Sequence, residues 1–258
     1  MTTIDTAVIP CGGLGTRLYP ITRWIPKELL PVGLKPLLFW TLDEVADAGL
    51  MRAIIVTNPH KPLLEAVARS YKGPLELTLV PQHHPRGLGD ALLSARDELG
   101  DAPFVAVLPD NLFDGPNPTT AVLETYHTTG LATVLLAQVS REDEPTKGAT
   151  AHAHTARSSD GTLRVTRLGE KGSGRFPAGA DRALTPIGRT AFAGDVLLEF
   201  EEQARSLPLA AEVDDVPILR RLAARGALAG VVCAGKFHDV GVPEGYRQAV
   251  SEHPASFP

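Results

Sequence analysis

The sequence predicts an α/β fold in which a mostly parallel sheet carries helices on both faces. From Thr6 to Leu108, short apolar runs rich in β-branched residues alternate with segments of helical periodicity. The runs are almost continuously apolar, which is typical of strands buried on both sides of a sheet. The chain has 258 residues, 43% of them hydrophobic and 21% charged, so we expect residues 1–258 to form a single domain.

The expected elements alternate through the first part of the chain. In order they are strand Thr6–Ile9, helix Leu37–Ala48, strand Ala53–Val56, helix Leu63–Ser70, strand Leu75–Val80, helix Asp90–Leu99 and strand Phe104–Leu108. Gly49 and Gly100 fit the position just past a helix end, and Pro36 fits a first helical turn. This order predicts a Rossmann-like sheet.

From Arg141 to Pro186 the pattern changes to polar alternation, which is typical of a smaller, half-exposed sheet. Residues 149–156 and 163–168 resemble its strands, and we interpret the segment 141–186 as an inserted lobe. The elements expected after it are strand Ile187–Phe192, helix Asp195–Arg205, helix Val216–Arg225 and strand Gly230–Ala234.

Composition and charge exclude several classes of partner. The formal net charge is −5 and no long Lys/Arg run occurs, so we expect no nucleic-acid partner. No apolar run approaches the ~20 residues of a membrane span and no signal peptide is evident, so we expect a cytoplasmic protein with no membrane partner. Cys11 and Cys233 lack the spacing of a disulfide framework or zinc site. The oligomeric state stays open, a homo-oligomer included.

A glycine-rich segment, Cys11–Leu18, directly follows the first expected strand. Its glycines let backbone amides approach an anion, and ligands of open α/β sheets bind at the carboxyl ends of strands. It is not a P-loop, because no Gly-Lys-Ser/Thr follows, and Leu18 replaces the third glycine of a dinucleotide fingerprint. We interpret the segment as a phosphate-binding loop, with a plain tight turn as the alternative. Its candidate nucleotide contacts are Gly12, Gly13, Gly15 and Thr16.

Candidate charged groups follow at three places. Lys27 lies between prolines that stiffen the backbone around a positioned cation, although read alone it is as readily a solvated surface charge. Asp110 ends a buried strand and Asp239 follows another, where such sheets present catalytic groups. Carboxylate oxygens suit Mg²⁺, and an Asx turn or helix cap is the alternative for each residue.

Three motifs resemble the signature of sugar-1-phosphate nucleotidylyltransferases: Gly-Gly-x-Gly-Thr-Arg-Leu, Pro-Lys-Glu-Leu-Leu-Pro-Val and Lys-Pro-Leu. Ile-Pro-Lys-Glu at Ile25–Glu28 is closest to the bacterial UTP:glucose-1-phosphate uridylyltransferases, with the thymidylyltransferase branch next. The resemblance implies a Mg²⁺-dependent transfer from a nucleoside triphosphate to a sugar 1-phosphate, with release of pyrophosphate. It implies that Arg17 contacts the triphosphate and Lys27 the reacting phosphate.

The resemblance extends to a base-reading segment and to the carboxylates. Gln82 and Gly87 match a glutamine and a glycine that pair with the pyrimidine edge, and Asp90 stands where the uridylyltransferases usually have His. By themselves, Gln82 is an unremarkable loop residue and Gly87 a turn residue. The resemblance also implies that Asp110 and Asp239 form a metal pair for Mg²⁺.

In the inserted lobe, the resemblance implies sugar contacts. Glu170 and Lys171 match an acid that holds sugar hydroxyls and a lysine that holds the sugar phosphate, and Gly148 matches a glycine whose backbone meets the sugar. A surface ion pair and a turn glycine are the alternatives. Pro186–Arg189 resembles a segment that lines the sugar pocket, whereas Glu212–Val216 departs from the family's pattern.

Other functions stay open at this point. The same residues could serve a dTTP-dependent synthase or another sugar phosphate. A regulatory protein that binds nucleotides without turnover, and a dinucleotide-dependent oxidoreductase, are alternatives from other classes.

Overall fold

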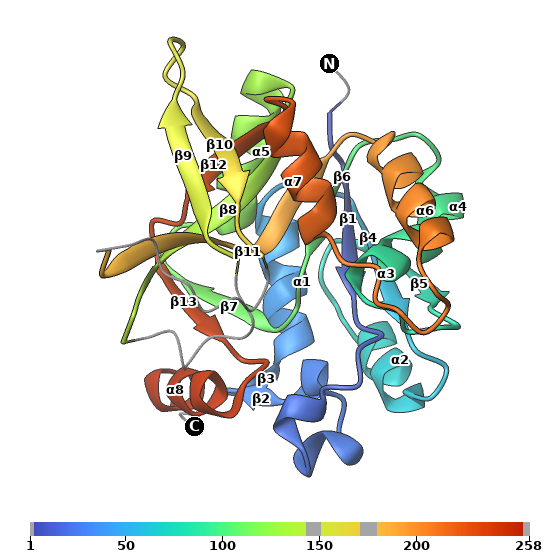
Figure 1. Cartoon of the computed structure of the whole chain (residues 1–258). Coiled ribbons are helices and arrows are strands. Elements are labelled where there is room, and N and C mark those ends of the chain that lie inside the picture. The colour runs from blue at the N-terminus through green and yellow to red at the C-terminus, as the bar shows by residue number, and fades with distance from the viewer. Residues whose placement is uncertain (1–2, 143–150, 171–179, 255–258) are drawn as a thin grey trace.

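A nine-stranded sheet forms the centre of the part of the chain that the computed structural model describes, residues 3–142, 151–170 and 180–254 (Figure 1). Its strand order is β5-β4-β1-β6-β11-β8-β12-β10-β9. The strands are β1 (Thr6–Pro10), β4 (Arg52–Thr57), β5 (Glu76–Pro81), β6 (Phe104–Val107), β8 (Ala132–Ser140), β9 (Ala153–Arg157), β10 (Leu163–Leu168), β11 (Arg182–Phe192) and β12 (Leu228–Val232).

Two short pairs complete the strands, β2 (Pro31–Val32) with β3 (Lys35–Pro36), and β7 (Asn111–Asp114) with β13 (Lys236–Asp239). The α-helices are α1 (Leu37–Asp47), α2 (Pro62–Arg69), α3 (Leu88–Ser94), α4 (Arg96–Leu99), α5 (Pro118–Thr129), α6 (Val196–Ser206), α7 (Val216–Ala224) and α8 (Pro243–Glu252). Three 3₁₀ turns follow β1: η1 (Thr16–Leu18), η2 (Ile21–Arg23) and η3 (Lys27–Leu29).

The β5-β4-β1-β6 half of the sheet is parallel and confirms the predicted α/β class. Successive side chains of β1 point to opposite faces, so Ala7 and Ile9 join one apolar cluster and Val8 joins another. Helices α1, α2 and α5 cover the first face, and α3, α6 and α7 cover the second. The carboxyl end of β1 therefore lies between the two layers of helices that cover the sheet.

The other half of the sheet is mixed, and it corrects the expectation of a separate smaller sheet. β10 pairs with β12 and β9 pairs with both β10 and β11, which closes this half into a small barrel. Val165 and Leu168 of β10 are buried in the same cluster as the inner face of α7. The alternation seen in the sequence is real, but the apolar side of these strands packs into the main core.

The last part of the expected lobe also belongs to the main sheet. β11 begins at Arg182 rather than Ile187, because residues 182–186 pair with the carboxyl-terminal half of β8. Of the other expected elements, the helix Asp90–Leu99 is divided into α3 and α4 around Ala95.

A buried arginine ties the centre of the sheet to α1. Arg189 of β11 is fully buried, and its guanidinium donates to the Glu44 carboxylate at 2.7 and 2.6 Å. It also donates to the carbonyl oxygens of Leu108 at 2.8 Å and Asn111 at 3.0 Å. These carbonyls flank Asp110, so one side chain fixes the turn that follows β6. Pro186, Ile187 and Gly188 line a cleft, whereas Arg189, expected as part of the same pocket-lining segment, does not.

We predict that Arg189→Met lowers the free energy of unfolding by about 3–5 kcal/mol, because it leaves a mostly buried carboxylate without its partner. Urea denaturation measures the change. Arg205→Met is the matched control, since Arg205 also pairs with a glutamate but is 76% exposed, and its loss should stay within about 0.5 kcal/mol. Equal losses in the two variants would contradict the role of Arg189.

Candidate active site

The glycine-rich loop leaves the carboxyl end of β1 and keeps an open side. Gly15 has φ of +66°, a left-handed conformation that favours glycine. A Cβ on Gly13 would meet nothing within 4 Å, so the backbone there is accessible. Gly12, Gly13, Gly15 and Thr16 all line a cleft, as the phosphate-loop interpretation expects.

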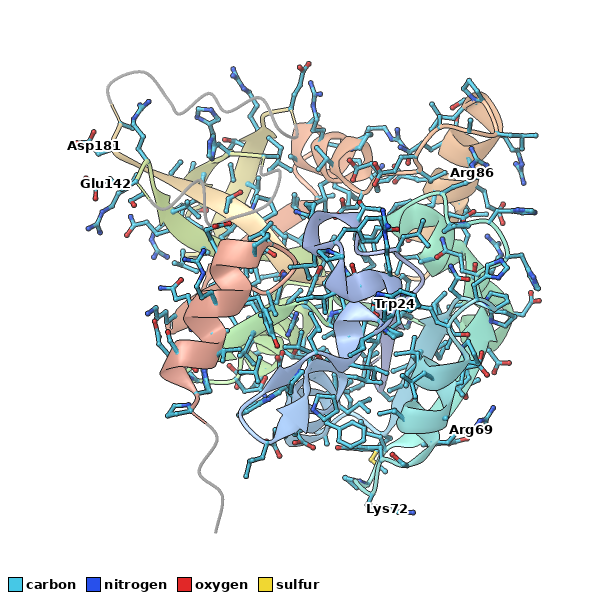
Figure 2. The ribbon with its side chains drawn as sticks, turned by 90° about the horizontal axis from the view of Figure 1, so that it is seen from below. Trp24, Arg69, Lys72, Arg86, Glu142 and Asp181 are labelled. Carbon is cyan, nitrogen blue, oxygen red and sulfur yellow. The ribbon has the colours of Figure 1, made fainter. Side chains whose placement is uncertain are left out.

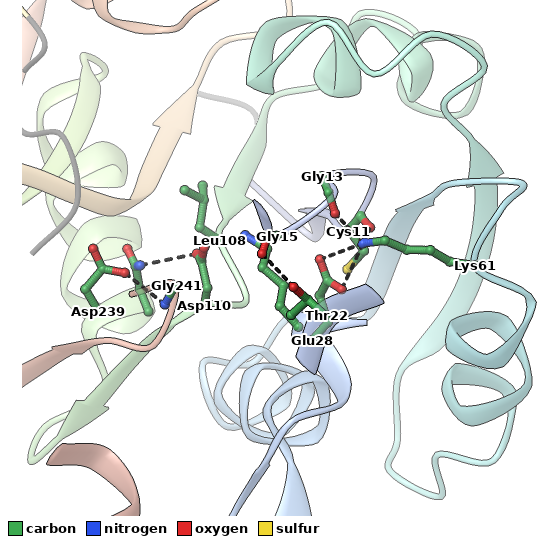
Figure 3. Close-up of polar contacts among 12 residues, drawn as sticks. Cys11, Gly13, Gly15, Thr22, Glu28, Lys61, Leu108, Asp110, Asp239 and Gly241 are labelled. Atoms are coloured by element: carbon green, nitrogen blue, oxygen red, sulfur yellow. Dashed lines mark hydrogen bonds and ion pairs between the residues drawn. The ribbon is translucent and has the colours of Figure 1, made fainter. Parts of the chain in front are cut away.

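The opposite side of the loop is held by residues that the sequence analysis did not single out. Lys61 Nζ donates to the carbonyl oxygens of Cys11 at 2.9 Å and Gly13 at 2.5 Å (Figure 3), and Asn58 Nδ2 donates to that of Gly12 at 3.0 Å. In a planar trans peptide the N–H points away from the carbonyl oxygen. The amides that follow these three carbonyls therefore point away from Lys61 and Asn58, an arrangement that suits an anion.

Lys61 also links the loop to the segment that carries Lys27. Its ammonium lies 3.1 Å from Glu28 Oε2, and the Glu28 side chain is fully buried. Burial raises the pKa of the Glu28 carboxyl above its usual range, although Lys61 and Lys27 oppose this. The pair is thus an internal strut under the loop.

Lys27 and Asp110 form an ion pair at the centre of the site. Lys27 Nζ lies 2.5 Å from Asp110 Oδ2, with side-chain exposures of 16% and 9%. Burial opposes the charge on Lys27, but Asp110 and Glu28 outweigh it and raise the pKa of Lys27 to about 12. Burial likewise opposes the charge on Asp110, and Lys27 outweighs it, so the pKa of Asp110 lies below its usual range. Both groups are therefore charged at neutral pH.

The second predicted carboxylate lies beside the first. Asp239 ends β13, opposite Asn111 of β7, and its Oδ1 accepts a bond from the Gly241 amide at 3.0 Å (Figure 3). A Cβ on Gly241 would lie 2.8 Å from Asp110 Oδ2 and 3.0 Å from Asp239 Oδ1. Both carboxylates therefore face the space beside Gly241, and two carboxylates facing one space fit the oxygen ligands of Mg²⁺.

A different acidic and histidine cluster lies on the other face of the same two strands. Ligand atoms of Asp114, His238 and Glu252 all lie within 4.8 Å of one another. Neighbouring residues of a strand point to opposite faces, so His238 faces away from Asp239. The three residues do not line the cleft. This cluster is separate from the predicted Mg²⁺ pair.

The cleft has two adjoining compartments of about 620 and 650 Å³. The first is lined by the predicted base-reading residues Gln82 and Gly87, and the second by Arg17 and Asp239. The two share the glycine loop together with Lys27 and Asp110. The ion pair therefore lies where the compartments meet.

The loop between α6 and α7 lines part of the first compartment. Arg86, labelled in Figure 2, donates through Nε to the Ala211 carbonyl at 3.2 Å and through Nη2 to that of Pro208 at 3.1 Å. Val213 N donates to the Arg86 carbonyl, so the loop between α6 and α7 is tied to the base-reading segment. This places Glu212 in the lining of both compartments, a position that the divergent sequence there does not reveal.

Of the predicted sugar contacts, only Glu170 is among the described residues, and it does not line either compartment. Glu170 follows β10 and is exposed. Gly148 and Lys171 lie outside the described residues. The second compartment is instead lined by Pro186, Ile187 and Gly188 of β11, among other residues.

Comparisons with known proteins show the family and the fold of the chain. Residues 6–255 match the family described as nucleotidyl transferase. The chain is 30% identical to UTP–glucose-1-phosphate uridylyltransferase 2 of Streptococcus pyogenes serotype M3, over 100% of this chain and 93% of that relative.

Solved structures share the fold over nearly the whole chain. A UDP-glucose pyrophosphorylase complexed with UDP-glucose gives a TM-score of 0.82 at 26% identity, covering 97% of this chain and 98% of that one. A Bacillus anthracis protein, provisionally described as a glucose-1-phosphate thymidylyltransferase in complex with a sucrose, gives 0.77 at 23% identity, covering 98% and 97%, which is a likeness of fold alone. Within the described ranges, no helix has the length and apolar character to cross a membrane.

We predict that Lys61→Met lowers the free energy of unfolding by roughly 3 kcal/mol, because it leaves the buried Glu28 carboxylate uncompensated. Without Lys61 the folded state binds a proton on Glu28 more tightly than the unfolded state does. The loss should therefore shrink as the pH falls from about 8 to about 5.

Urea denaturation at several pH values checks this expectation. Lys72→Met is the control, since Lys72 projects into solvent (Figure 2). The double variant Lys61→Met with Glu28→Gln should recover part of the loss, since no buried charge is then left unpaired. A loss independent of pH and not relieved in the double variant would argue against the Lys61–Glu28 strut.

Proposed function

Because the chain belongs to the nucleotidyl transferase family and is a sugar-1-phosphate nucleotidyltransferase, we propose that it transfers the uridylyl group of UTP to glucose 1-phosphate and releases pyrophosphate. The observation that carries the proposal is the position of Lys27 and Asp110 at the junction of two compartments. One compartment suits a nucleotide and the other a sugar phosphate, so the two reacting phosphates meet at the ion pair.

In this proposal the triphosphate lies along the glycine loop. Lys61 and Asn58 hold the carbonyl oxygens of the loop, and the N–H groups of the same peptide units point toward the triphosphate oxygens. Arg17 is a further cation in the lining. Contacts proposed for the nucleotide are Gly12, Gly13, Gly15, Thr16, Arg17, Gln82 and Gly87.

Asp110 and Asp239 are the proposed ligands of Mg²⁺, supported by the shared space beside Gly241. The ion, when bound, supplies positive charge to the phosphate oxygens. With Asp110 holding the ion, Lys27 would be free to contact the reacting phosphate, and its charge would stabilise that phosphate.

The reaction needs no general base, because the attacking phosphate is already an anion. An oxygen of glucose 1-phosphate attacks the α-phosphorus of UTP in line, the bond to the β-phosphate oxygen breaks, and pyrophosphate leaves. What the site contributes is the positioning of two anions that repel each other, together with charge that favours the transition state. Lys27 is the residue proposed for the second role.

Sugar contacts at Gly148, Glu170 and Lys171, within a segment 141–186 of one domain, are proposed from the motif resemblance alone. Thymidylyl transfer from dTTP is the second candidate function. The motif resemblance supports it, because the thymidylyltransferase branch is the next closest at Ile25–Glu28 and because uracil and thymine differ only by a methyl group.

We predict that pyrophosphate release is fastest with UTP and glucose 1-phosphate. Uracil, cytosine and purine nucleotides, and dTTP, would each be paired with a panel of sugar 1-phosphates in Mg²⁺, with pyrophosphate quantified by a coupled assay. Faster turnover with dTTP would transfer the assignment to the thymidylyl function. Faster turnover with ATP or GTP would overturn both pyrimidine functions.

We predict that Asp110→Asn and Asp239→Asn each lower kcat by roughly 10²-fold or more, because each removes one electrostatic stabiliser of the transition state. The matched control is Asp114→Asn. Asp114 is the last residue of β7 and does not line the cleft, so this variant should keep a rate near that of the wild type. Steady-state kinetics over a range of Mg²⁺ concentrations measures the three variants. Near-normal rates for either cleft variant would rule out the metal pair.

A further inference from the structure

The amide of Gln82 is held in one orientation by its surroundings. The residue is 2% exposed and lines the 620 Å³ compartment. Its Nε2 donates to Asp90 Oδ2 at 2.7 Å and to the Gly87 carbonyl at 3.3 Å. A carboxylate and a carbonyl oxygen only accept hydrogen bonds, so both must face the NH₂ group of Gln82. The assignment of nitrogen and oxygen in this amide therefore follows from its partners.

This orientation leaves the oxygen of the amide beside the nucleotide loop. A Cβ built on Gly12 would lie 2.0 Å from Gln82 Oε1, so this close approach of the two segments depends on a glycine at position 12. Gln82 Oε1, an acceptor, therefore lies against Gly12, and both residues line the same compartment. The donor side of the amide is already used within the protein.

Asp90 can hold this orientation because it lies on a fixed element. It is in the first turn of α3, which begins at Leu88 directly after Gly87. The Gly89 amide donates to the Val213 carbonyl at 2.8 Å, and a Cβ on Gly87 would lie 2.4 Å from Glu212 Cγ. Gln82 itself follows β5, and its backbone N–H donates to the Thr57 carbonyl at 2.8 Å. The Gln82–Asp90 bond therefore joins two anchored segments.

We propose that Asp90 is a specificity-determining residue: by holding the Gln82 amide with Oε1 toward the ligand, it restricts the site to bases that present an N–H on that edge. Uracil and thymine carry a proton on N3, whereas N3 of cytosine is an acceptor and would face the Gln82 oxygen without a hydrogen bond. An acceptor opposed to an acceptor in a buried site costs affinity. This inference rests on the proposed function, because it takes the cavity of Gln82 as the base site.

The test compares kcat/KM for UTP, dTTP and CTP in three variants. The wild type should prefer UTP to CTP by roughly hundredfold or more. In Asp90→Ala the Gln82 amide can rotate and offer Nε2, so this preference should fall by about tenfold or more, while the ratio of UTP to dTTP changes little. Asp90→Asn keeps an oxygen that accepts from Nε2 and should retain most of the preference. Asp97→Ala, which removes an exposed carboxylate from α4, should match the wild type.

Two outcomes separate this inference from the proposed function. If Asp90→Ala keeps the wild-type ratio of UTP to CTP, Asp90 does not set the base preference, and the inference is wrong although the enzyme makes UDP-sugar. If the wild type turns over no nucleotide with any sugar phosphate, the proposed function fails. Calorimetric titration of UTP and CTP into the wild type and Asp90→Ala then tests the base preference directly, and equal UTP-to-CTP affinity ratios would overturn it.

Discussion

The contact between Lys27 and Asp110 is the interaction on which the site depends. It joins the segment after the glycine loop to the turn after β6, two parts of the chain that are 83 residues apart. Two nearly buried charges remain ionised because each is the other's partner. An ion pair of this kind can be opened by a ligand that offers each group a new partner. A phosphate for the lysine and a metal for the carboxylate are such partners.

Two further buried pairs hold this contact in place. Arg189 and Glu44 fix the turn that carries Asp110, and Lys61 and Glu28 fix the loop and the backbone next to Lys27. Both cations also donate to backbone carbonyls, so they act on the shape of the chain rather than on the ligand. Buried ion pairs add little net stability, and their use here is in positioning. The Lys27–Asp110 pair lines the cleft, whereas the two supporting ion pairs lie behind its wall and hold that wall in place.

The α/β class, the parallel strands and the glycine-rich loop after β1 could be predicted from the sequence, because continuous apolar strands and glycine spacing are local signals. The barrel closure could not, since alternation in β10 shows that one face is buried but not that its partner is β12. Lys61, and the role of the Arg189 side chain in holding the turn after β6, were missed for the same reason. Their partners lie 50 and 145 residues away, at Cys11 and Glu44, and nothing local marks them. Glu170 shows the opposite limit, a motif residue that the structure leaves exposed and outside the cleft lining.

A crystal structure with UDP-glucose and Mg²⁺ tests the central claim most directly, namely that the Lys27–Asp110 contact marks the reacting phosphate. The account predicts that Lys27 Nζ has left Asp110 for a phosphate oxygen of UDP-glucose, with Mg²⁺ between Asp110 and Asp239. A complex in which the ion pair stays closed and the phosphates lie elsewhere in the cleft would contradict it.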